Sequence, residues 1–279
     1  MIQNRKEQNN SYQDIQIVNR SKSLISRMSQ TFLLKRLEGE VDFRYTLMLR
    51  KCDMEKPYII CHMMSSVDGR IDCAMTEQLK GVEDYYETLA KLNADTTVSG
   101  KRTTELEMAL SGKYVSETLE IYGKEDFSKK VDAKGYEVVV DSKGELLWEK
   151  ENGDEKPLLI ITSEQVTKEY LNYLDEQNIS WIVCGKNTTD LVKASKILYE
   201  EFHVERMAVV GGAVINGAFL KAGLLDEVSI LIGAGIDGRK GMPGVFDGFD
   251  MKQPVISLSL KDVEPFKSGA VWIRYKTVE

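Results

Sequence analysis

The segment 207-MAVVGGAVINGAFL-220 decides the fold of this chain. Its apolar first part is typical of a buried strand, Gly211 and Gly212 predict a turn without side chains, and the residues that follow have helical apolar spacing. In a strand, glycine turn and helix of this kind, backbone N–H groups and the positive end of the helix can face a phosphate. The alternative is a tight turn that only joins a strand to a helix, so other segments must decide.

A second predicted strand end carries positive charge. The segment 97-TVSGKRTTE-105 places Lys101 and Arg102 directly after a glycine, at the predicted start of a helix that ends near Leu110. Two cations and neighbouring threonine hydroxyls suit a dianionic group, because the cations form charge-assisted hydrogen bonds and the hydroxyls fix position. The alternative is a solvated basic pair beside an ordinary threonine N-cap.

A third strand end is rich in small and turn-forming residues. In 57-PYIICHMMSSVDGRID-72 a mostly apolar run predicts a strand buried on both faces, and the residues SSVDG follow it. Open α/β sheets bind their ligands at the carboxyl ends of strands, which makes this turn a candidate site. Asp68 is a candidate for orienting a substrate or handling a proton, or else it only caps the turn.

Composition and charge limit the classes of function. The chain has 279 residues, 42% of them hydrophobic, and a formal net charge of −7, which disfavours general nucleic-acid binding or an anionic membrane surface. Its four cysteines form no CxxC pair and there are only two histidines, so the clustered ligands of a zinc site are missing and we expect no metal. Without a signal peptide or an apolar run of about 18 residues, we expect a cytoplasmic protein.

Apolar runs alternate with helical patterns from residue 57 onward. This alternation predicts an α/β fold with a mostly parallel sheet covered on both faces, and the last two strands, which have no helix between them, predict an antiparallel edge. The polar residues 1–53 are expected to form an arm, partly disordered or helical, and residues 54–279 the compact domain. The glycine-rich tract 233–248 is either a second anion site with Arg239 and Lys240 or a long surface loop. The expected strands are 58–64, 96–99, 137–141, 158–162, 181–184, 207–210, 227–232, 255–260 and 270–275, and the expected helices are 82–92, 103–110, 164–176, 189–200 and 213–222.

Four segments, in order, resemble the reductase domain of riboflavin biosynthesis, the RibD C-terminal domain family. They are SSVDGRID at 65–72, ADTTVSGKRTTE at 94–105, VVVDSKGEL at 138–146 and VVGGAVINGAFLKAGLLDEVSI at 209–230. The resemblance implies a dihydrofolate-reductase-like three-layer sandwich and an NADPH-dependent reductase that acts on the ribosyl C1′ of a pyrimidine ribosylamine phosphate, as 5-amino-6-(5-phosphoribosylamino)uracil reductase does. It also implies a homodimer.

The resemblance further implies roles for individual residues. Gly100, Lys101, Arg102 and Thr103 would meet the 2′-phosphate end of NADPH, Gly211, Gly212, Ala213 and Val214 its pyrophosphate, and Ser142 or Ser163 its ribose and adenine. Asp68 and Ser66 would be the catalytic residues, and Ser65, Gly69 and Arg70 would contact substrate. The family's Trp and Arg are missing from 73–92, so a dihydrofolate-reductase-like enzyme with another small heterocyclic or carbonyl substrate, or a non-catalytic NADPH-binding module, remain alternatives.

Overall fold

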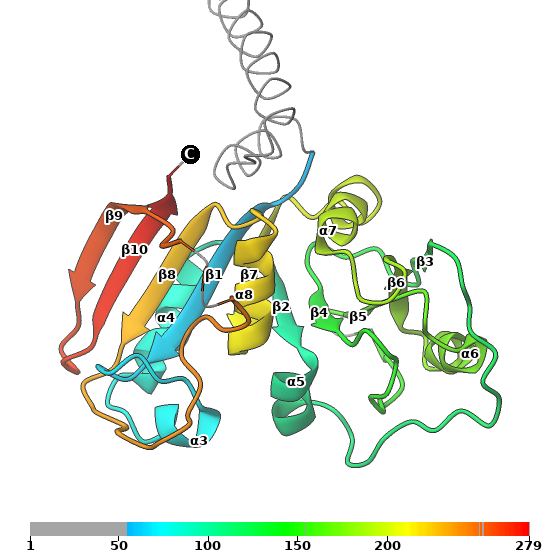
Figure 1. Cartoon of the computed structure of the whole chain (residues 1–279), viewed down its shortest axis with the longest axis horizontal. Helices are drawn as coiled ribbons and strands as arrows, with labels where there is room; N and C mark the ends of the chain where they lie inside the picture. The colour runs from blue at the N-terminus through cyan, green and yellow to red at the C-terminus, as the bar shows by residue number, and fades with distance from the viewer. Residues whose placement is uncertain (1–54, 154, 251, 253, 279) are drawn as a thin grey trace, which may run out of the picture. The chain divides into compact units, whose positions relative to one another are not determined.

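The computed structural model describes residues 55–153, 155–250, 252 and 254–278 (Figure 1). The predicted arm 1–53 lies outside these residues. A ten-stranded sheet with strand order β3-β6-β5-β4-β2-β7-β1-β8-β10-β9 runs through the described part. The strands are β1 (Tyr58–Ser65), β2 (Thr96–Gly100), β3 (Asp126–Ser128), β4 (Glu137–Val140), β5 (Leu158–Thr162), β6 (Ser180–Val183), β7 (Arg206–Gly211), β8 (Glu227–Ile232), β9 (Leu258–Pro265) and β10 (Val271–Thr277). The helices are α3 (Cys73–Thr76), α4 (Val82–Lys91), α5 (Lys101–Glu107), α6 (Lys168–Glu176), α7 (Leu191–Glu200) and α8 (Ala213–Lys221).

The sheet has a parallel centre and antiparallel edges. Seven neighbouring strands, from β6 to β8 in the sheet order, are parallel, whereas β10 pairs antiparallel with both β8 and β9. The predicted fold class, a mostly parallel sheet with an antiparallel C-terminal edge, is confirmed. At the other edge, β3 pairs antiparallel with β6, and this three-residue strand was not predicted because it is too short to carry an alternating pattern.

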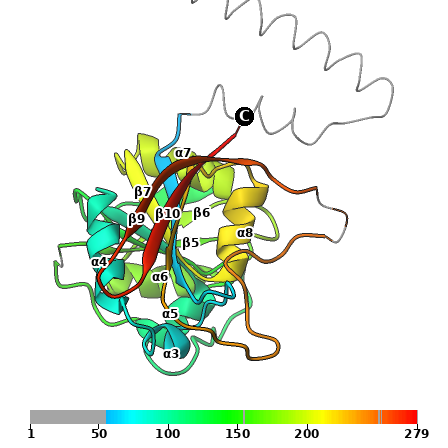
Figure 2. The ribbon, with the colours of Figure 1, turned by 90° about the vertical axis from the view of Figure 1, so that its left-hand side faces the viewer.

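Helices cover both faces of the sheet, so the domain has three layers. One face packs against α7 and α8 in the largest apolar cluster, which includes Val209 of β7 and Phe219 of α8. The opposite face packs against α6 near β4 to β6, and against α4 near β1 and β8. Figure 2, seen from the β9 edge, shows α4 and α8 on opposite sides of the sheet. The central strands are almost entirely buried because both of their faces are covered, which explains their mostly apolar sequences.

Some predicted boundaries were wrong. We expected the helix that follows β5 to start at Glu164, but α6 starts at Lys168 because the Thr167 hydroxyl accepts a hydrogen bond from the backbone N–H of Tyr170 and forms the N-cap. The predicted strand 255–260 begins too early, since β9 runs over Leu258–Pro265. None of the helices in the described ranges is both long and apolar enough to traverse a bilayer.

Candidate functional site

The two glycine-containing turns lie side by side at the carboxyl edge of the sheet. β2 and β7 are parallel neighbours, and Ser99 pairs with Gly211 at their ends, so the turns that follow both strands leave the sheet together. The close approach is between Thr103 of α5 and the glycine pair. A Cβ atom on Gly212 would lie 3.1 Å from Thr103 Oγ1, and one on Gly211 would lie 3.3 Å from the same hydroxyl.

Glycine is required at these turns by space and by backbone conformation. Gly211 has a φ of +154°, which L-residues rarely adopt, and the peptide bond between Gly211 and Gly212 is cis. A Cβ atom on Gly100 would lie 3.2 Å from Cβ of Ile215 on α8. Side chains at these positions would therefore press against Thr103 of α5 and Ile215 of α8, whereas glycine lets the two helix starts lie close together.

The amino end of α8 has the properties of an anion site. Gly212 is its N-cap, and no side chain caps this end in the described part of the chain. The first backbone N–H groups of the helix and the positive end of its dipole are thus available to an anion. Val214, in the first turn, has 71% of its surface exposed, although valine is apolar.

Helix α8 is held in place by the segment that follows β8. The amide of Asn216, a fully buried residue, donates a hydrogen bond to the carbonyl of Val245 (2.8 Å), and the backbone N–H of Asp247 donates to the carbonyl of Ala213 (3.0 Å). The tightest contact is at Gly217, where an added Cβ would lie 1.7 Å from the carbonyl oxygen of Asp247. Only glycine allows this segment to lie against the helix.

We therefore expect Gly217→Ala to destabilise the protein by about 1–3 kcal/mol, because the new methyl group overpacks against backbone. In an ordinary helix interior the same substitution would stabilise the protein, since glycine there is about 0.5–1 kcal/mol less favourable than alanine. Urea unfolding of the variant measures the effect, and Ala218→Gly on the next residue measures the ordinary glycine cost in the same helix. A Gly217→Ala protein as stable as the wild type would contradict the close packing.

The two predicted cations differ in their surroundings. Lys101 is partly buried and its ammonium forms an ion pair with the carboxylate of Glu145, in the turn after β4, with Glu105 more distant at 3.9 Å. Arg102 is exposed and makes no ion pair with any described residue. Lys143, which sequence reasoning did not select, is exposed in the same turn as Glu145. Arg102 and Lys143 are thus two cations available to a ligand at this edge.

Ser142 and Ser163 follow β4 and β5 at the same edge. The Ser142 hydroxyl lies 2.8 Å from Thr189 Oγ1, and the residue is partly exposed. Ser163 is fully buried, and its hydroxyl donates to the Ser142 carbonyl at 2.7 Å. Its burial favours a structural role that ties the two strand ends together, so its predicted contact with ribose or adenine is disfavoured.

Asp141, at the end of β4, was missed by the sequence reasoning. It is fully buried, and its Oδ2 accepts hydrogen bonds from the backbone N–H groups of Glu145 (2.6 Å) and Leu146 (2.9 Å). Its Oδ1 has no hydrogen-bond partner among the described residues. The signal was the sequence Asp-Ser-Lys-Gly, because aspartate commonly closes such a turn by accepting from the backbone.

The turn after β1 is tied to the glycine-rich tract 233–248. Asp68 accepts hydrogen bonds from the Ser66 hydroxyl (2.7 Å) and from the backbone N–H groups of Asp237 (3.0 Å) and Gly238 (3.1 Å). These hydrogen bonds, that of Ser66 first, lower the pKa of Asp68 to about 2. The carboxylate is therefore ionised at neutral pH and fastens two loops together, which favours the turn-capping interpretation over proton donation.

The predicted substrate residues belong to the same pair of loops. The carbonyl of Ser65 accepts from the N–H of Gly233 (2.8 Å), and Gly69 turns the chain with a φ of +75°. Arg70 donates from Nη1 to the carbonyl of Met242 (2.7 Å), and its buried Nε has no hydrogen-bond partner in the described part of the chain. Arg239 forms ion pairs with Asp72 and Asp237, so it is not free to hold a second anion.

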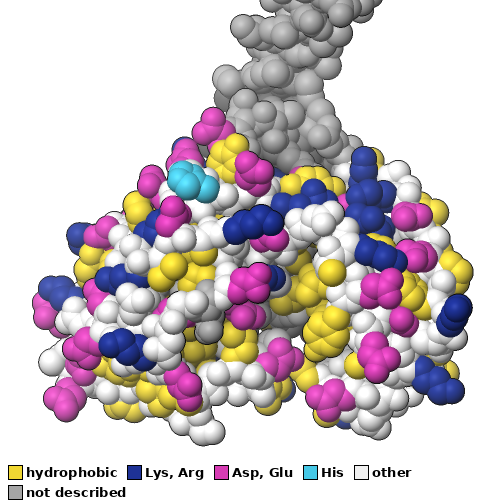
Figure 3. Space-filling view, turned by 180° about the vertical axis from the view of Figure 1, so that it is seen from behind, with side chains coloured by type: hydrophobic (Ala, Val, Ile, Leu, Met, Phe, Trp, Pro, Cys, Tyr) yellow, Lys and Arg dark blue, Asp and Glu magenta, His cyan; other side chains and the backbone are white. Residues whose placement is uncertain are grey.

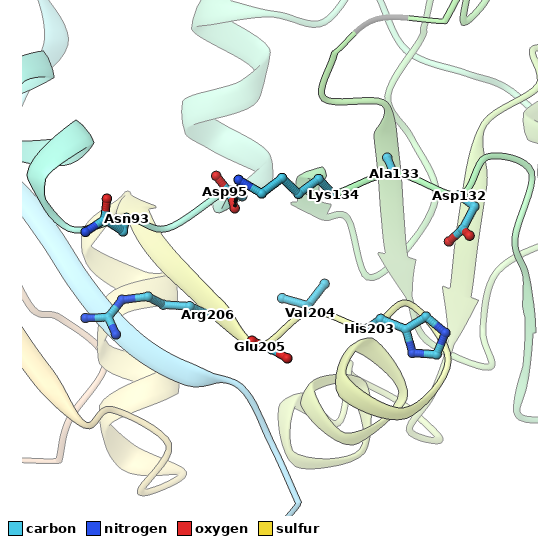
Figure 4. A pocket seen from close by; sticks show the side chains of 9 residues that line it. All are labelled: Asn93, Asp95, Asp132, Ala133, Lys134, His203, Val204, Glu205 and Arg206. Carbon is cyan, nitrogen blue, oxygen red and sulfur yellow. Dashed lines mark ion pairs between the residues drawn. The ribbon is translucent and has the colours of Figure 1, made fainter.

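A hollow of about 680 Å³ opens at the opposite edge of the sheet (Figure 4). Its lining residues precede strands: Asn93 and Asp95 come before β2, 132–134 before β4 and 203–205 before β7. Asp95 and Lys134 form an ion pair of 3.0 Å in its wall. Because the predicted site is at the carboxyl ends of these strands, this hollow is not part of it.

Charge is mixed on one face of the domain. On the face seen in Figure 3, acidic and basic side chains are interspersed. No continuous basic stripe crosses that face, in agreement with the acidic balance of the sequence. Among the described residues, no three His, Cys, Asp or Glu side chains are grouped in a way that could hold a metal ion.

Comparison with known proteins identifies one family and several relatives. The model of the RibD C-terminal domain family matches residues 57–272. The 2,5-diamino-6-ribosylamino-4(3H)-pyrimidinone 5′-phosphate reductase of Aquifex aeolicus is 27% identical over 72% of this chain and 87% of its own length. A protein of the same name from Methanothermobacter thermautotrophicus is 32% identical, over 39% of this chain and half of its own length. The solved structure of a pyrimidine reductase-like protein from Corynebacterium diphtheriae superposes with a TM-score of 0.59 at 16% identity, covering 84% of this chain and 99% of the other.

Proposed function

Because the chain belongs to the RibD C-terminal domain family, we propose that it is an NADPH-dependent reductase acting on the ribosyl C1′ of a pyrimidine ribosylamine 5′-phosphate. The observation that carries the proposal is the juxtaposition of Thr103 with Gly211 and Gly212 beside the uncapped amino end of α8. A second pair of loops lies at the ends of β1 and β8 in the same sheet. Hydrogen bonds to the Asp68 carboxylate hold these two loops together.

The residues at this edge fit a phosphorylated dinucleotide. Glycine keeps side chains off this turn, because an added Cβ would lie 3.3 Å (Gly211) or 3.1 Å (Gly212) from the Thr103 hydroxyl, so peptide groups would meet the ligand there. The amino end of α8 would hold the pyrophosphate, and Arg102 would hold the 2′-phosphate. When bound, NADPH supplies the hydride, and the protein supplies position and electrostatics.

The loops after β1 and β8 would position the substrate. The Asp68 carboxylate accepts hydrogen bonds from the 237–238 backbone and Arg70 donates one to the carbonyl of Met242, so these loops are tied into one wall beside β7. Such a wall would hold the C1′ atom at near-attack distance and limit access of water, effects that together can be worth several kcal/mol of activation free energy. Positioning, rather than proton donation by Asp68, is the role that the geometry favours.

The names of the relatives bear on the substrate. Two of them are named as reductases of 2,5-diamino-6-ribosylamino-4(3H)-pyrimidinone 5′-phosphate, in which the pyrimidine has not been deaminated. We therefore place this compound before 5-amino-6-(5-phosphoribosylamino)uracil as the substrate to test. Both present the same ribosylamine phosphate to the site and differ only in the ring.

The decisive experiment follows NADPH oxidation with each pyrimidine ribosylamine phosphate and with dihydrofolate as a comparison. We expect turnover with a ribosylamine phosphate only. Turnover with dihydrofolate or another heterocycle instead would favour a dihydrofolate-reductase-like enzyme. Tight NADPH binding without turnover on any of these compounds would favour a binding module and contradict the proposal.

The role of Asp68 predicts a particular pH dependence. Because hydrogen bonding lowers the pKa of Asp68 to about 2, the carboxylate stays ionised over the ordinary working range of an enzyme. We expect Asp68→Asn to raise KM for the pyrimidine substrate while leaving the ionisations seen in the pH profile of kcat between about pH 5 and 9 unchanged. Loss of an ionisation from that profile would instead assign proton transfer to Asp68.

A further inference from the structure

The ion pair between Lys101 and Glu145 joins two turns of the candidate cofactor site. Lys101 starts α5 after β2, and Glu145 lies in the turn after β4, the parallel neighbour of β2. The ammonium hydrogen-bonds to the Glu145 carboxylate, and both side chains are partly exposed, at 26% and 32%. A ligand that reaches the carboxyl end of β2 therefore meets a lysine that already has a counter-ion.

Glu145 is held where it is by the backbone of its own turn. The fully buried carboxylate of Asp141 accepts from the N–H groups of Glu145 and Leu146, and the carbonyl of Glu145 accepts from the N–H of Tyr114 (2.8 Å). Lys113 also lies near its carboxylate, at 3.7 Å, and Lys143 is in the same turn. The backbone of Glu145 is thus fixed on both sides, and its carboxylate lies between the ammonium groups of Lys101 and Lys113.

Arg102 provides the contrast on the same helix. It is the next residue, it is exposed, and none of the described residues forms an ion pair with it. The two adjacent cations thus differ. Lys101 is paired with a carboxylate, and Arg102 has no ion pair with a described residue. A phosphate that binds at this turn would meet the full charge of Arg102 and would meet the charge of Lys101 only by displacing Glu145.

We propose that Glu145 sets the preference between NADPH and NADH by competing with the cofactor 2′-phosphate for Lys101. This inference rests on the proposed function, because it assumes that a dinucleotide binds at the turn after β2. The carboxylate opposes the 2′-phosphate in two ways: it occupies the ammonium, and its negative charge repels the dianion. NADH has a hydroxyl in place of that phosphate, so Glu145 penalises NADPH alone.

The test measures binding of NADPH and NADH to the full chain carrying Glu145→Gln. The amide has the size of the carboxylate and no charge. We expect NADPH to bind about two- to fivefold more tightly, the range expected from releasing a partly exposed ion pair. NADH binding should change much less, and the gain for NADPH should shrink at 1 M salt, where exposed charges are screened.

Three matched proteins decide whether Glu145 acts through Lys101. In a Lys101→Ala background, the gain from Glu145→Gln should shrink to the part that direct repulsion of the 2′-phosphate contributes, whereas an undiminished gain overturns the competition for Lys101. Glu105→Gln removes an equal charge 3.9 Å from the same ammonium and should have a smaller effect. Glu145→Asp keeps the charge on a shorter side chain and should keep the wild-type preference within about twofold.

The possible failures are distinguishable. Wild-type protein that binds adenosine 2′,5′-bisphosphate more tightly than adenosine 5′-monophosphate supports the phosphate-binding turn on its own. If it does so and Glu145→Gln leaves the NADPH to NADH ratio unchanged, only the role of Glu145 is overturned. If the wild-type protein binds neither dinucleotide, the proposed function and this inference both fall.

Discussion

Replacing both Lys101 and Arg102 with alanine is expected to weaken NADPH binding by about a hundredfold while NADH binding falls by less than about threefold. The reason is the 2′-phosphate, a dianion that only NADPH carries and that these cations are placed to bind. A hydrogen bond to a charged group contributes about 1.5–3 kcal/mol, and each 1.4 kcal/mol is a factor of ten in affinity. One such hydrogen bond, together with part of a second, therefore accounts for the expected loss of about a hundredfold in NADPH affinity.

The single variants should divide this loss unequally. Arg102 is exposed without an ion pair in the described residues, whereas Lys101 is engaged with Glu145. We therefore expect Arg102→Ala to account for most of the loss and Lys101→Ala for less than about a factor of five. Calorimetric or fluorescence titration of the two cofactors against each variant gives the comparison directly.

A control must remove the same charge elsewhere. Lys196 on α7 and Lys221 on α8 are exposed, and both lie in the last half of their helices, toward the opposite edge of the sheet. The double variant Lys196→Ala/Lys221→Ala should leave both affinities nearly unchanged. Equal losses of NADPH and NADH affinity in the Lys101/Arg102 variant would argue against a 2′-phosphate site at this turn.

Much of the fold could be predicted from the sequence because the central strands are buried on both faces. Runs such as 58–64 and 207–210 are mostly apolar, as is typical of the strands of a parallel sheet that is covered on both faces. Helix starts were harder, since they depend on single hydrogen bonds. Ser163 and Thr167 are both good N-cap residues, and the choice of Thr167 follows from the burial of Ser163 against β4.

The candidate site was predictable to the level of its turns. Parallel strands bring their carboxyl ends to one edge, so finding glycine turns after two neighbouring strands was sufficient to place Gly100, Gly211 and Gly212 together. The partners of the charges were not predictable. Glu145 is 44 residues from Lys101, and no local pattern indicates that the carboxylate and the ammonium meet.

The family of the chain and the roles of its individual residues have different support. The match over residues 57–272 shows the family, whereas the cofactor contacts of individual residues, the homodimer and the cytoplasmic location stay predictions. Asp68 illustrates the difference between a motif and a role. Its place after β1 was predictable, but its three hydrogen bonds, two of them to a loop about 170 residues away, were not, and they give the carboxylate the role of fastening two loops together.

The second large effect is expected on stability, at Glu227. This carboxylate, at the start of β8, is fully buried and forms ion pairs of 2.5 Å with Lys261 of β9 and Arg274 of β10. It also accepts from the hydroxyl of Tyr58 on β1 at 3.0 Å. One side chain thus joins four strands, including the two antiparallel strands that no helix connects to the rest of the sheet.

Glu227→Ala should lower the free energy of unfolding by about 3 kcal/mol. Removing one partner of a buried ion pair costs about 3–5 kcal/mol because the other charges lose their counter-ion, and the lower end applies since Lys261 and Arg274 keep some contact with water. Urea unfolding at pH 7 measures the loss. The control is Glu264→Ala on β9, whose ion pair with Lys91 (3.0 Å) is exposed and should contribute less than about 1 kcal/mol.

The pH dependence of this difference tests its electrostatic origin. Burial by itself would raise the pKa of Glu227, but hydrogen bonds and charge from Arg274 and Lys261 outweigh it and lower the pKa below the ordinary value of about 4.3. A carboxyl group whose pKa is lowered by folding adds stability above its unfolded pKa and loses it as the pH falls through the folded pKa. The gap between wild type and Glu227→Ala should therefore be full at pH 7 and shrink below about pH 4. A gap that is constant from pH 7 to pH 3 would mean that Glu227 stabilises the sheet edge by packing, with its charge contributing nothing.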